Sequence, residues 1–157
     1  MTTHLEVLAT WFRRVWNEGN ASAIDEMFQK EGKARGLGGQ GDDAEIDADG
    51  GIAEQVRVGP DGFKGFHEHF FKMMDQFDIR VNQSMEQGDW ISALCSVQAT
   101  CRQSGKRVGM TGSVLVRVVD GQIAEAYNHW DFMTIYQQLG LLPENAFERC
   151  LGGEKIA

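Results

Sequence analysis

The sequence predicts an α+β fold in which a curved antiparallel sheet wraps around a long helix and forms a cone. Over the first half of the chain, apolar residues recur at the spacing of a helix. After Asp78 the period changes to two, and turn signals containing glycine divide the second half into four strand-like segments. Helices that cover one face of a curved sheet leave a pocket at the open end of the cone. A length of 157 residues suits one ordinary domain, so residues 1–157 are expected to form a single unit.

Two short helices are expected first. Between Leu5 and Trp16 the apolar residues define one helical face, and the segment Asn17–Asn20, which contains a glycine, breaks this helix. A second helix follows through Ala23–Phe28, and residues 31–36 are expected to form a short first strand.

A long third helix is expected to begin after Gly59-Pro60 and to extend to about Gln76. Its apolar residues form a stripe that faces the sheet. The stripe consists of Phe63, Phe66, Phe70, Met73, Met74 and Phe77.

Four strands are expected after the long helix, joined by hairpin turns in which a glycine stands next to Asp or Ser. Helices followed by an antiparallel meander place the helices on one face of the sheet. The four strands are expected at Ile79–Glu86, Trp90–Cys101, Val108–Val119 and Gln122–Trp130.

One further segment stands out by its composition. Residues 37–55 are rich in Gly and Asp, which predicts a mobile surface loop that could act as a lid over the pocket. Within it, Glu45 to Val56 has carboxylates near the positions of a calcium-binding loop. Val56 stands where such a loop needs a bidentate Glu, so a solvated acidic loop is the favoured interpretation.

A final helix is expected at about Phe132–Leu139, ended by Gly140.

The composition bounds the partners and the compartment. Fifteen Lys and Arg against 23 Asp and Glu give a net charge of −8, which argues against duplex nucleic acid and against an anionic membrane surface. A small hydrophobic molecule is the expected partner, and no cofactor is expected. The first twenty residues lack the pattern of a signal peptide, and no stretch is long enough for a transmembrane helix. Cys95, Cys101 and Cys150 form no CxxC pair, which favours reduced thiols and a cytoplasmic location.

Three motifs carry a family resemblance. In chain order they are FRRVWNEGNASAIDEMF, GPDGFKGFHEHFFKMMDQFDIRV and VRVVDGQIAEAYNHWDFMTIYQQLGLLP. Together they resemble the SnoaL-like polyketide cyclases of the nuclear-transport-factor-2-like superfamily, from Trp11 to Pro143. The resemblance implies a cone-shaped α+β barrel with a deep pocket, often paired into a homodimer through the outer face of the sheet. It also implies a fold that hosts aldol-type cyclases, isomerases and epoxide hydrolases as well as proteins without catalysis.

The closing strand matches the most informative part of the family pattern. Family members usually show Glu, a hydrophobic residue, Trp, an acid, any residue, an aromatic residue and Asp, which matches Glu125 to Asp131. Alternation places Asn128 and Trp130 on the face toward the cone, and Glu125 and Tyr127 on the other face. Asn128 stands at the first acidic position, where an amide can orient a substrate oxygen or a water but cannot accept a proton.

Three other polar residues are candidates for the site. Asp131 is the acid–base candidate, because an apolar pocket would raise its pKa; the alternative is that it caps the final helix. His67 is either a satisfied core histidine or a donor or base that reaches the pocket. It lies on a different helix face from His69, so no metal site is expected. Arg35 occupies a position where relatives often carry a histidine that faces the pocket.

Bulky apolar side chains are numerous enough to line a pocket as well as fill a core, and the sequence does not separate these uses. As ligand-binding walls we expect Trp16, Phe63, Trp90, Met110 and Trp130.

Two functions remain open from the sequence. In the first, the domain binds a small hydrophobic carbonyl compound and acts as a cofactor-independent cyclase or isomerase. Asp131, Asn128 and His67 would then form the catalytic group. In the second, it is a non-catalytic ligand-binding domain or a dimeric interaction domain of the same fold.

Overall fold

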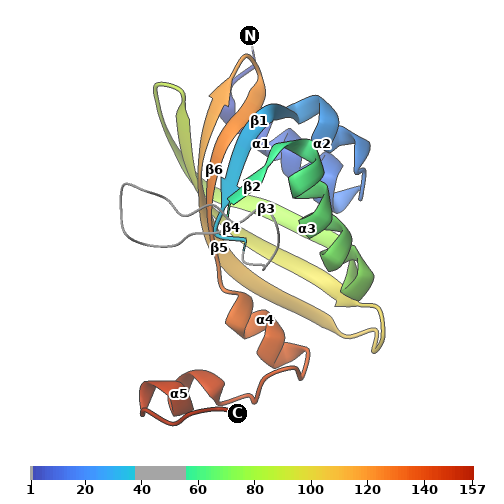
Figure 1. Ribbon diagram of the computed structural model, residues 1–157, viewed down its shortest axis with the longest axis vertical. Coiled ribbons are helices and arrows are strands. Elements are labelled where there is room, and N and C mark those ends of the chain that lie inside the picture. The colour runs from blue at the N-terminus through green and yellow to red at the C-terminus, as the bar shows by residue number, and fades with distance from the viewer. Residues whose placement is uncertain (1, 38–55) are drawn as a thin grey trace.

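The computed structural model describes residues 2–37 and 56–157. Figure 1 shows the order of its elements along the chain. They are α1 (His4–Trp11), η1 (Phe12–Asn17), α2 (Ser22–Met27), β1 (Phe28–Arg35), β2 (Val56–Val58), α3 (Gly59–Met73), β3 (Met74–Gln87), β4 (Trp90–Cys101), β5 (Arg107–Val119), β6 (Gln122–Trp130), α4 (Phe132–Gln138) and α5 (Ala146–Leu151).

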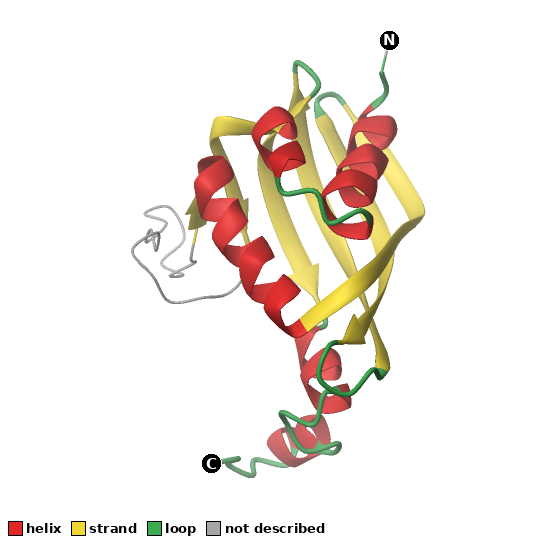
Figure 2. Ribbon diagram, turned by 90° about the vertical axis from the view of Figure 1, so that its right-hand side faces the viewer, coloured by secondary structure: helices red, strands yellow, loops and turns green. Residues whose placement is uncertain are grey.

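A six-stranded sheet in the order β2-β1-β6-β5-β4-β3 curves around the helices, which confirms the predicted α+β class. Figure 2 shows helices on its concave side and the C-terminal helices projecting beyond it. The four strands after the long helix form the predicted antiparallel meander, and β1 joins it through a parallel pairing with β6 that was not predicted. β1 and β6 lie far apart in the sequence and are not joined by a turn, so no local sequence signal predicts their pairing.

The three hairpins of the meander form at the expected turns. Asp120 and Gly121 have φ angles of 51° and 73°, and Val119 pairs directly with Gln122. Positive φ at both central residues is the geometry of a type I′ turn, whose twist matches that of the two strands. The local turn chemistry therefore sets the register of β5 against β6 as far as Val118. A register shift between Arg117 and Val118 then sets the pairing of the rest of β6.

The long helix ends three residues earlier than the apolar stripe predicted. Met74 already has an extended backbone, and its pairing with Cys101 begins β3. The strand is irregular between Asp75 and Asp78, and Gln76 has a φ of 51°. Met74 still lies in the core, with no exposed surface.

The first helix changes its hydrogen-bond pattern at Phe12. From there to Asn17 the chain forms a π-helix, in which the N–H of Glu18 bonds the carbonyl of Arg13 at 2.8 Å. The Asn17 side chain ends this segment by bonding both backbone groups of Ile79, with its Oδ1 2.8 Å from the Ile79 nitrogen. This amide ties η1 to the edge strand β3.

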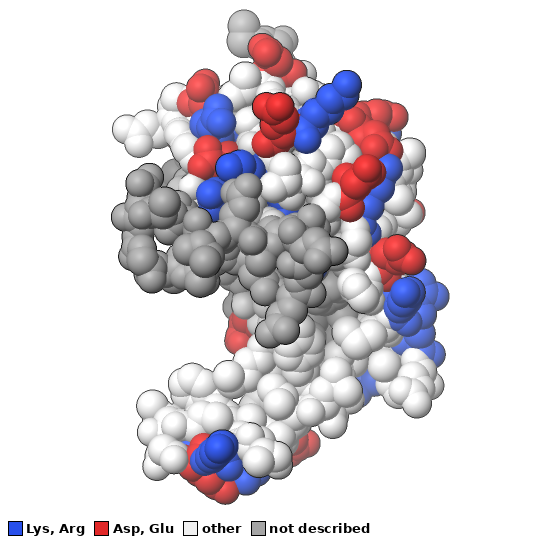
Figure 3. Space-filling model, in the orientation of Figure 1, with Lys and Arg blue, Asp and Glu red and all other residues white. Residues whose placement is uncertain are grey.

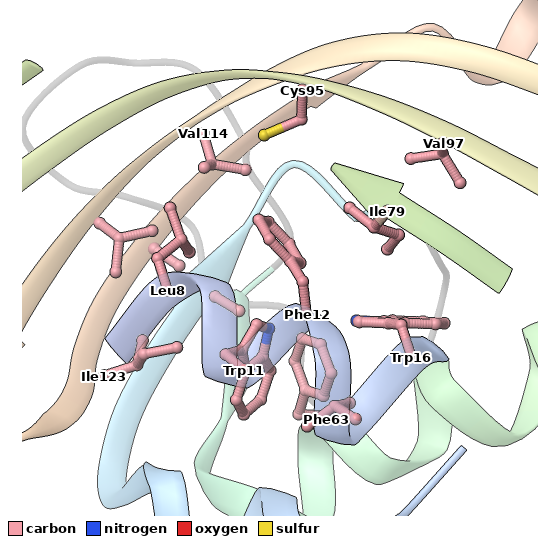
Figure 4. Close-up of a cluster of buried hydrophobic side chains, with 14 of the residues drawn as sticks. Leu8, Trp11, Phe12, Trp16, Phe63, Ile79, Cys95, Val97, Val114 and Ile123 are labelled. Carbon is pink, nitrogen blue, oxygen red and sulfur yellow. The ribbon is translucent and has the colours of Figure 1, made fainter. Parts of the chain in front are cut away.

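The core lies between the helices and the concave face of the sheet. Figure 4 shows Leu8, Trp11 and Phe12 from the first helix opposite Cys95 and Val114 from the central strands. Burial raises the pKa of the Cys95 thiol to about 11, and all three cysteines are free.

The surface of the described residues carries mixed charge. In Figure 3, acidic and basic side chains are interspersed over the upper part of the molecule, whereas much of the C-terminal arm shows neither. That arm contains α4 and α5 and exposes Leu141, Phe147 and Leu151. No helix in residues 2–37 or 56–157 is long and apolar enough to cross a membrane.

Candidate functional site

A small cavity of about 60 Å³ lies between the helices and the concave face of the sheet. The described lining is almost wholly aromatic and aliphatic, and it comes from α1, η1, α3, α4 and four strands. It consists of Trp11, Phe12, Trp16, Leu37, Phe63, Phe66, Phe70, Phe77, Ile79, Val97, Met110, Asn128, Trp130 and Phe132.

Asn128 contributes the one amide group among the described side chains of this lining. Its Nδ2 donates to the carbonyl of Arg35 at 2.9 Å, and its Oδ1 accepts from the indole nitrogen of Trp130 at 3.3 Å. A primary amide can form four hydrogen bonds, so one N–H and one acceptor lone pair remain for a ligand or water. The two bonds that are made fix the orientation of the amide.

Two glycines make room for this arrangement. Gly112 faces Trp130 across the β5–β6 pair, and a Cβ there would lie 2.3 Å from the indole ring. Gly36 has a φ of 82°, and its Cβ would lie 1.8 Å from the carbonyl oxygen of Asn128. The missing side chains therefore let the Trp130 ring lie against the sheet and let the end of β1 approach β6.

Aromatic pairs close the cavity on two sides. The ring of Phe12 meets Trp130 edge to face, with the centroids 6.3 Å apart. Phe132, at the start of α4, packs against Phe70 at 5.7 Å and Phe66 at 6.4 Å. Edge-to-face and tilted ring pairs of this kind stabilise by about 1 kcal/mol beyond the area they bury. Ring contacts therefore close the cavity both at Trp130 and at the start of α4.

Asp131 lies at the surface in the capping geometry. One carboxylate oxygen accepts from the backbone N–H of Thr134 at 3.2 Å, and the other accepts from its hydroxyl at 2.5 Å. The residue is exposed and does not belong to the described cavity lining. Gln138 then fixes α4, because its amide bonds both the N–H and the carbonyl of Gly109 at 2.8 Å.

His67 lies on α3 but points away from the cavity, toward the end of η1. Its Nε2 is 2.8 Å from the carbonyl of Val15, and its ring packs against Trp16 and Phe71. Burial lowers the pKa of His67, an effect that the bond to Val15 only partly offsets. A neutral ring that donates through Nε2 satisfies a carbonyl that the π-helix leaves free.

The residues expected as ligand-binding walls separate into two groups. Trp16, Phe63, Met110 and Trp130 line the cavity. Trp90 lies on the convex face of the sheet, where its ring neighbours Tyr127 at 6.3 Å. The strand pattern contains the signal for this, because buried residues of β4 alternate from Ile91 onward and Trp90 falls on the opposite side.

Sequence reasoning did not single out Leu37, Phe12, Phe77 or Gly112 as parts of the site. Phe77 was assigned to the helical stripe, whereas it reaches the cavity from β3. The Asp120-Gly121 turn alone would pair Gly112 with His129, and the register shift between Arg117 and Val118 places Gly112 opposite Trp130 instead. Leu37 comes directly before the segment that the structure does not describe.

The titratable groups of β6 are gathered on the convex face. Glu125 accepts hydrogen bonds from Tyr127 at 2.6 Å and from Arg117 at 3.1 Å. Burial raises the pKa of Glu125, but these bonds and the charges of Arg117 and Arg35 outweigh it and leave the pKa below its usual value. Arg35 also lies over the ring of Tyr127, 5.4 Å from its centroid.

Within residues 2–37 and 56–157, no three His, Cys, Asp or Glu side chains form a cluster that could hold a metal ion. The calcium-loop interpretation of Glu45 to Val56 and the predicted lid at 37–55 lie outside the described residues, apart from Leu37 and Val56.

Comparison with known proteins gives a family match and a set of similar folds. Residues 6–139 match the family model described as SnoaL-like polyketide cyclase. No protein of curated function matches the sequence.

Solved structures with a similar fold include IdmH from Streptomyces antibioticus, which is provisionally assigned as a polyketide cyclase. It is 19% identical with a TM-score of 0.69, and the match covers 87% of this chain and 97% of that one. A provisionally assigned SnoaL-like polyketide cyclase from Jannaschia sp. CCS1 is 15% identical with a TM-score of 0.68, covering 88% and 92%. A protein with a ketosteroid isomerase-like fold from Catenulispora acidiphila, in complex with trimethylamine, is 14% identical with a TM-score of 0.67, covering 88% and 95%.

Proposed function

Because this chain belongs to the SnoaL-like polyketide cyclase family, we propose that it binds a small apolar carbonyl compound in the cavity beside Asn128 and Trp130. One observation carries the proposal. The apolar lining contains one oriented amide, Asn128, that keeps a free N–H. A few polar groups placed in an apolar enclosure are the usual arrangement of a small-molecule site.

The energetics favour a ligand with one acceptor atom. Aromatic walls supply the affinity through burial of apolar surface. A single hydrogen bond from Asn128 adds about 1 kcal/mol, which corresponds to about a fivefold preference for a ketone over a hydrocarbon of the same shape. A ligand with a charged group would lose its hydration without finding a counter-charge in the described lining.

Binding without catalysis is the form of the proposal that the geometry supports best. The described lining contains no titratable side chain, whereas acid–base catalysis needs one within hydrogen-bond reach of the substrate. Asp131 would have to leave both of its bonds to Thr134 to act there.

Cyclase or isomerase chemistry is a second candidate, and the family match favours it. In that case Asn128 would hold the carbonyl oxygen and Asp131 would exchange the proton. His67 would contribute only by holding the end of η1, because its Nε2 is already bonded to Val15.

The binding proposal is tested with acetophenone and ethylbenzene, two molecules of nearly the same shape that differ in the carbonyl group. Quenching of tryptophan fluorescence reports occupancy, since three of the four tryptophans line the cavity. The wild type should bind acetophenone about fivefold more tightly. Asn128→Leu should bind the two equally. Absence of saturable binding to the wild type, or an unchanged preference in Asn128→Leu, would overturn the proposal.

Turnover separates the two candidate functions. Asp131→Asn should bind acetophenone as the wild type does under the binding proposal. A panel of polyketide-like and steroid-like ketones is then incubated with both proteins and followed by mass spectrometry. Turnover by the wild type that disappears in Asp131→Asn would establish the cyclase or isomerase candidate instead.

We also propose that the protein forms a homodimer through the convex face of the sheet. Met85, Leu94 and Leu115 are exposed there, with exposed fractions of 71%, 52% and 41%. Light scattering after gel filtration should give a dimeric mass for the wild type and a monomeric mass for Leu94→Asp. A monomeric wild type at micromolar concentration would contradict this assembly.

A further inference from the structure

The C-terminal arm, which contains α4 and α5, leaves the body of the domain. Figure 1 and Figure 2 both show α5 beyond the end of the sheet, joined to the rest of the chain through α4. In Figure 1, α1 to α3 lie to the right of the sheet, whereas α5 extends to the left, the side of the convex face. The family match ends at Leu139, so α5 lies beyond the matched residues and the match assigns no role to it.

The arm has a defined shape although it stands apart from the sheet. The Gln137 amide donates to the carbonyls of Glu144 at 2.9 Å and Pro143 at 3.3 Å, which fixes the connection between the two helices. At the end of α5, the Arg149 guanidinium donates to both carboxylate oxygens of Glu154, at 2.8 and 2.7 Å. Polar bonds therefore hold α5 at both of its ends.

α5 exposes an apolar face. Phe147 and Leu151 lie one helical turn apart on the same face, and their exposed fractions are 55% and 77%. Glu148 lies beside this face and is also exposed. A helix of six residues gains little stability from its own hydrogen bonds and depends on the packing of an apolar face. The side chains that could supply such packing in α5 are exposed instead.

A surface groove with a volume of about 370 Å³ opens at the base of the arm. The end of α3, the turn between β4 and β5 and the end of α4 meet there. The apolar lining residues are Met73, Leu139 and Leu141, and the others are Lys72, Cys101, Arg102 and Gln103. No described residue of α5 lines this groove, so it is open to a helix from another chain.

The groove and the exposed face of α5 complement each other in two ways. Met73 and Leu141 are exposed in the groove and offer apolar surface to an apolar helix face. Lys72 offers a positive charge, because its amino group is held only by Glu68 of the same helix at 3.8 Å. The exposed carboxylate of Glu148 supplies the opposite charge on α5. One chain therefore carries both halves of a matching contact.

A second copy of this chain is the partner that these halves fit. When one chain carries a surface and its complement, two copies can exchange the contact reciprocally, and a two-fold axis closes the pair. The convex face, through which the homodimer is proposed, lies on the side to which α5 extends. A partner on that face is therefore within reach of the arm.

We propose that α5 of each protomer packs into the groove of its partner, so that the two copies exchange their arms. Phe147 and Leu151 then cover the apolar lining of that groove, and Glu148 lies close to its lysine. This inference rests on the proposed homodimer, which places the partner beside the arm. The arm and the groove contain none of the convex-face residues, so the two assignments can fail separately.

Crosslinking between chains tests the exchange. Cys150 lies on α5 and is exposed, and Cys101 lines the groove, whereas Cys95 is buried. Hydrogen bonds from Ser104 lower the pKa of the Cys101 thiol, which favours its reaction with maleimides. Bis(maleimido)ethane, a short crosslinker of thiols, is added to an equal mixture of Cys101→Ser and Cys150→Ser. Each chain then has only one of the two thiols, so a link between them must join two chains.

The mixture should give a crosslinked dimer on a denaturing gel, and mass spectrometry of its peptides should identify the link between Cys101 and Cys150. Each variant alone should give little dimer. A dimer band no stronger in the mixture than in either variant alone would overturn the exchange. In the wild type, a link found only within monomers would place α5 in the groove of its own chain and would overturn it as well.

The affinity of the homodimer gives a second measurement. Phe147→Ser should raise the dissociation constant of the dimer by about tenfold or more, because a homodimer loses the contact twice. Met73→Glu alters the groove instead of the helix and should have a similar effect. Leu5→Ser is the matched control, because Leu5 is an exposed apolar residue of α1, far from the arm in Figure 1. Analytical ultracentrifugation measures the constants, and circular dichroism confirms that the variants are folded.

The outcomes separate this inference from the homodimer on which it rests. If Leu94→Asp is monomeric but Phe147→Ser and Met73→Glu dimerise as the control does, the convex-face homodimer stands and the exchange of arms falls. If Leu94→Asp remains dimeric while Phe147→Ser is monomeric, the exchange stands and the convex-face assignment falls. A monomeric wild type that gives no crosslink between chains would overturn both.

Discussion

The two faces of β6 hold their polar groups in opposite ways. On the concave face, Asn128 is an uncharged amide in an aromatic enclosure, bonded to the Arg35 carbonyl and to Trp130. On the convex face, Glu125 is ionised and bonded to Tyr127 and Arg117, with partial exposure to solvent. From Glu125 onward β6 alternates, so it carries a neutral binding face and an ionic surface one residue apart.

This difference bears on function. The carboxylates near the closing strand of this chain point away from the cavity or cap a helix. The concave face offers shape, apolar surface and one hydrogen-bonding amide. These are the properties of a binding site, and substitutions on the two faces of β6 should therefore separate cleanly into effects on ligand binding and effects on surface electrostatics.

The largest effect is expected where the concave face is most crowded. Gly112→Ala places a Cβ 2.3 Å from the Trp130 ring and 2.8 Å from the carbonyl of His129. The ring must move into the cavity, so unfolding free energy should fall by about 1–3 kcal/mol and acetophenone binding should be lost. Urea denaturation and fluorescence titration measure the two effects. Ser113→Ala, the next residue on the convex face, should change stability by less than about 0.5 kcal/mol.

If Gly112→Ala were as mild as Ser113→Ala, the packing of Trp130 against the sheet would not define the site. The distinction between a crowded concave face and a tolerant convex face would then have no energetic basis.

A second test concerns His67, which bonds the Val15 carbonyl near the end of η1 and so holds the helix that packs on the concave face. His67→Leu removes the bond to the Val15 carbonyl and leaves that buried group unpaired, so stability at pH 7.5 should fall by about 1–3 kcal/mol. Burial lowers the pKa of His67 in the folded state. Its contribution is therefore complete above the unfolded pKa of about 6.5 and is lost as the pH falls through the lower folded pKa.

Urea denaturation of wild type and His67→Leu between pH 7.5 and pH 4.5 measures this dependence. The difference in unfolding free energy should shrink as the pH falls. A difference that stays constant would mean that the His67 ring is not held neutral by its surroundings.

The sequence predicted the faces of β6 better than it predicted the far partners of the strands. Alternation assigned Asn128 and Trp130 to the concave side, because that signal is local. The register shift between Arg117 and Val118, which sets their partners on β5, was not predicted. The parallel pairing of β1 with β6 depends on contacts between distant segments, and no turn encodes it. The helix prediction ran past Met73 because apolar spacing does not record where the backbone changes conformation.

The candidate site shows the same limit. The aromatic walls at Trp16, Phe63 and Trp130 follow from periodicity. The hydrogen-bond shift of the π-helix has no signature in an apolar pattern that continues unbroken through Trp16. The sequence left Asp131 open between a helix cap and an acid–base group, and its bonds to Thr134 show the cap.

A smaller effect is expected at Asp131. Asp131→Ala removes the cap of α4, and loss of an N-cap typically costs about 1 kcal/mol. Because the carboxylate bonds Thr134 at the surface, the affinity for acetophenone should stay within twofold of the wild type. Calorimetric titration together with urea denaturation checks both values. Loss of binding with unchanged stability would assign Asp131 to the cavity and break the separation of the two faces.

The smallest effect is expected on the convex face itself, from Glu125→Gln. The side chains of Glu125 and Arg117 keep exposed fractions of 24% and 36%, so solvent screens the pair and its loss should cost less than about 1 kcal/mol. The folded pKa of Glu125 lies below its ordinary value of 4.5. The contribution is therefore constant above pH 4.5 and is lost as the pH falls through the folded pKa.

Urea denaturation of wild type and Glu125→Gln at pH 7 and at pH 3 tests this, with Glu31→Gln, an exposed residue of β1, as the control for a lost negative charge. The control should show no such difference between the two pH values. Acetophenone binding should be the same in all three proteins. If Glu125→Gln changed the affinity for acetophenone, the ionic groups of the convex face would act through β6 on Asn128, and the two faces could no longer be treated as independent.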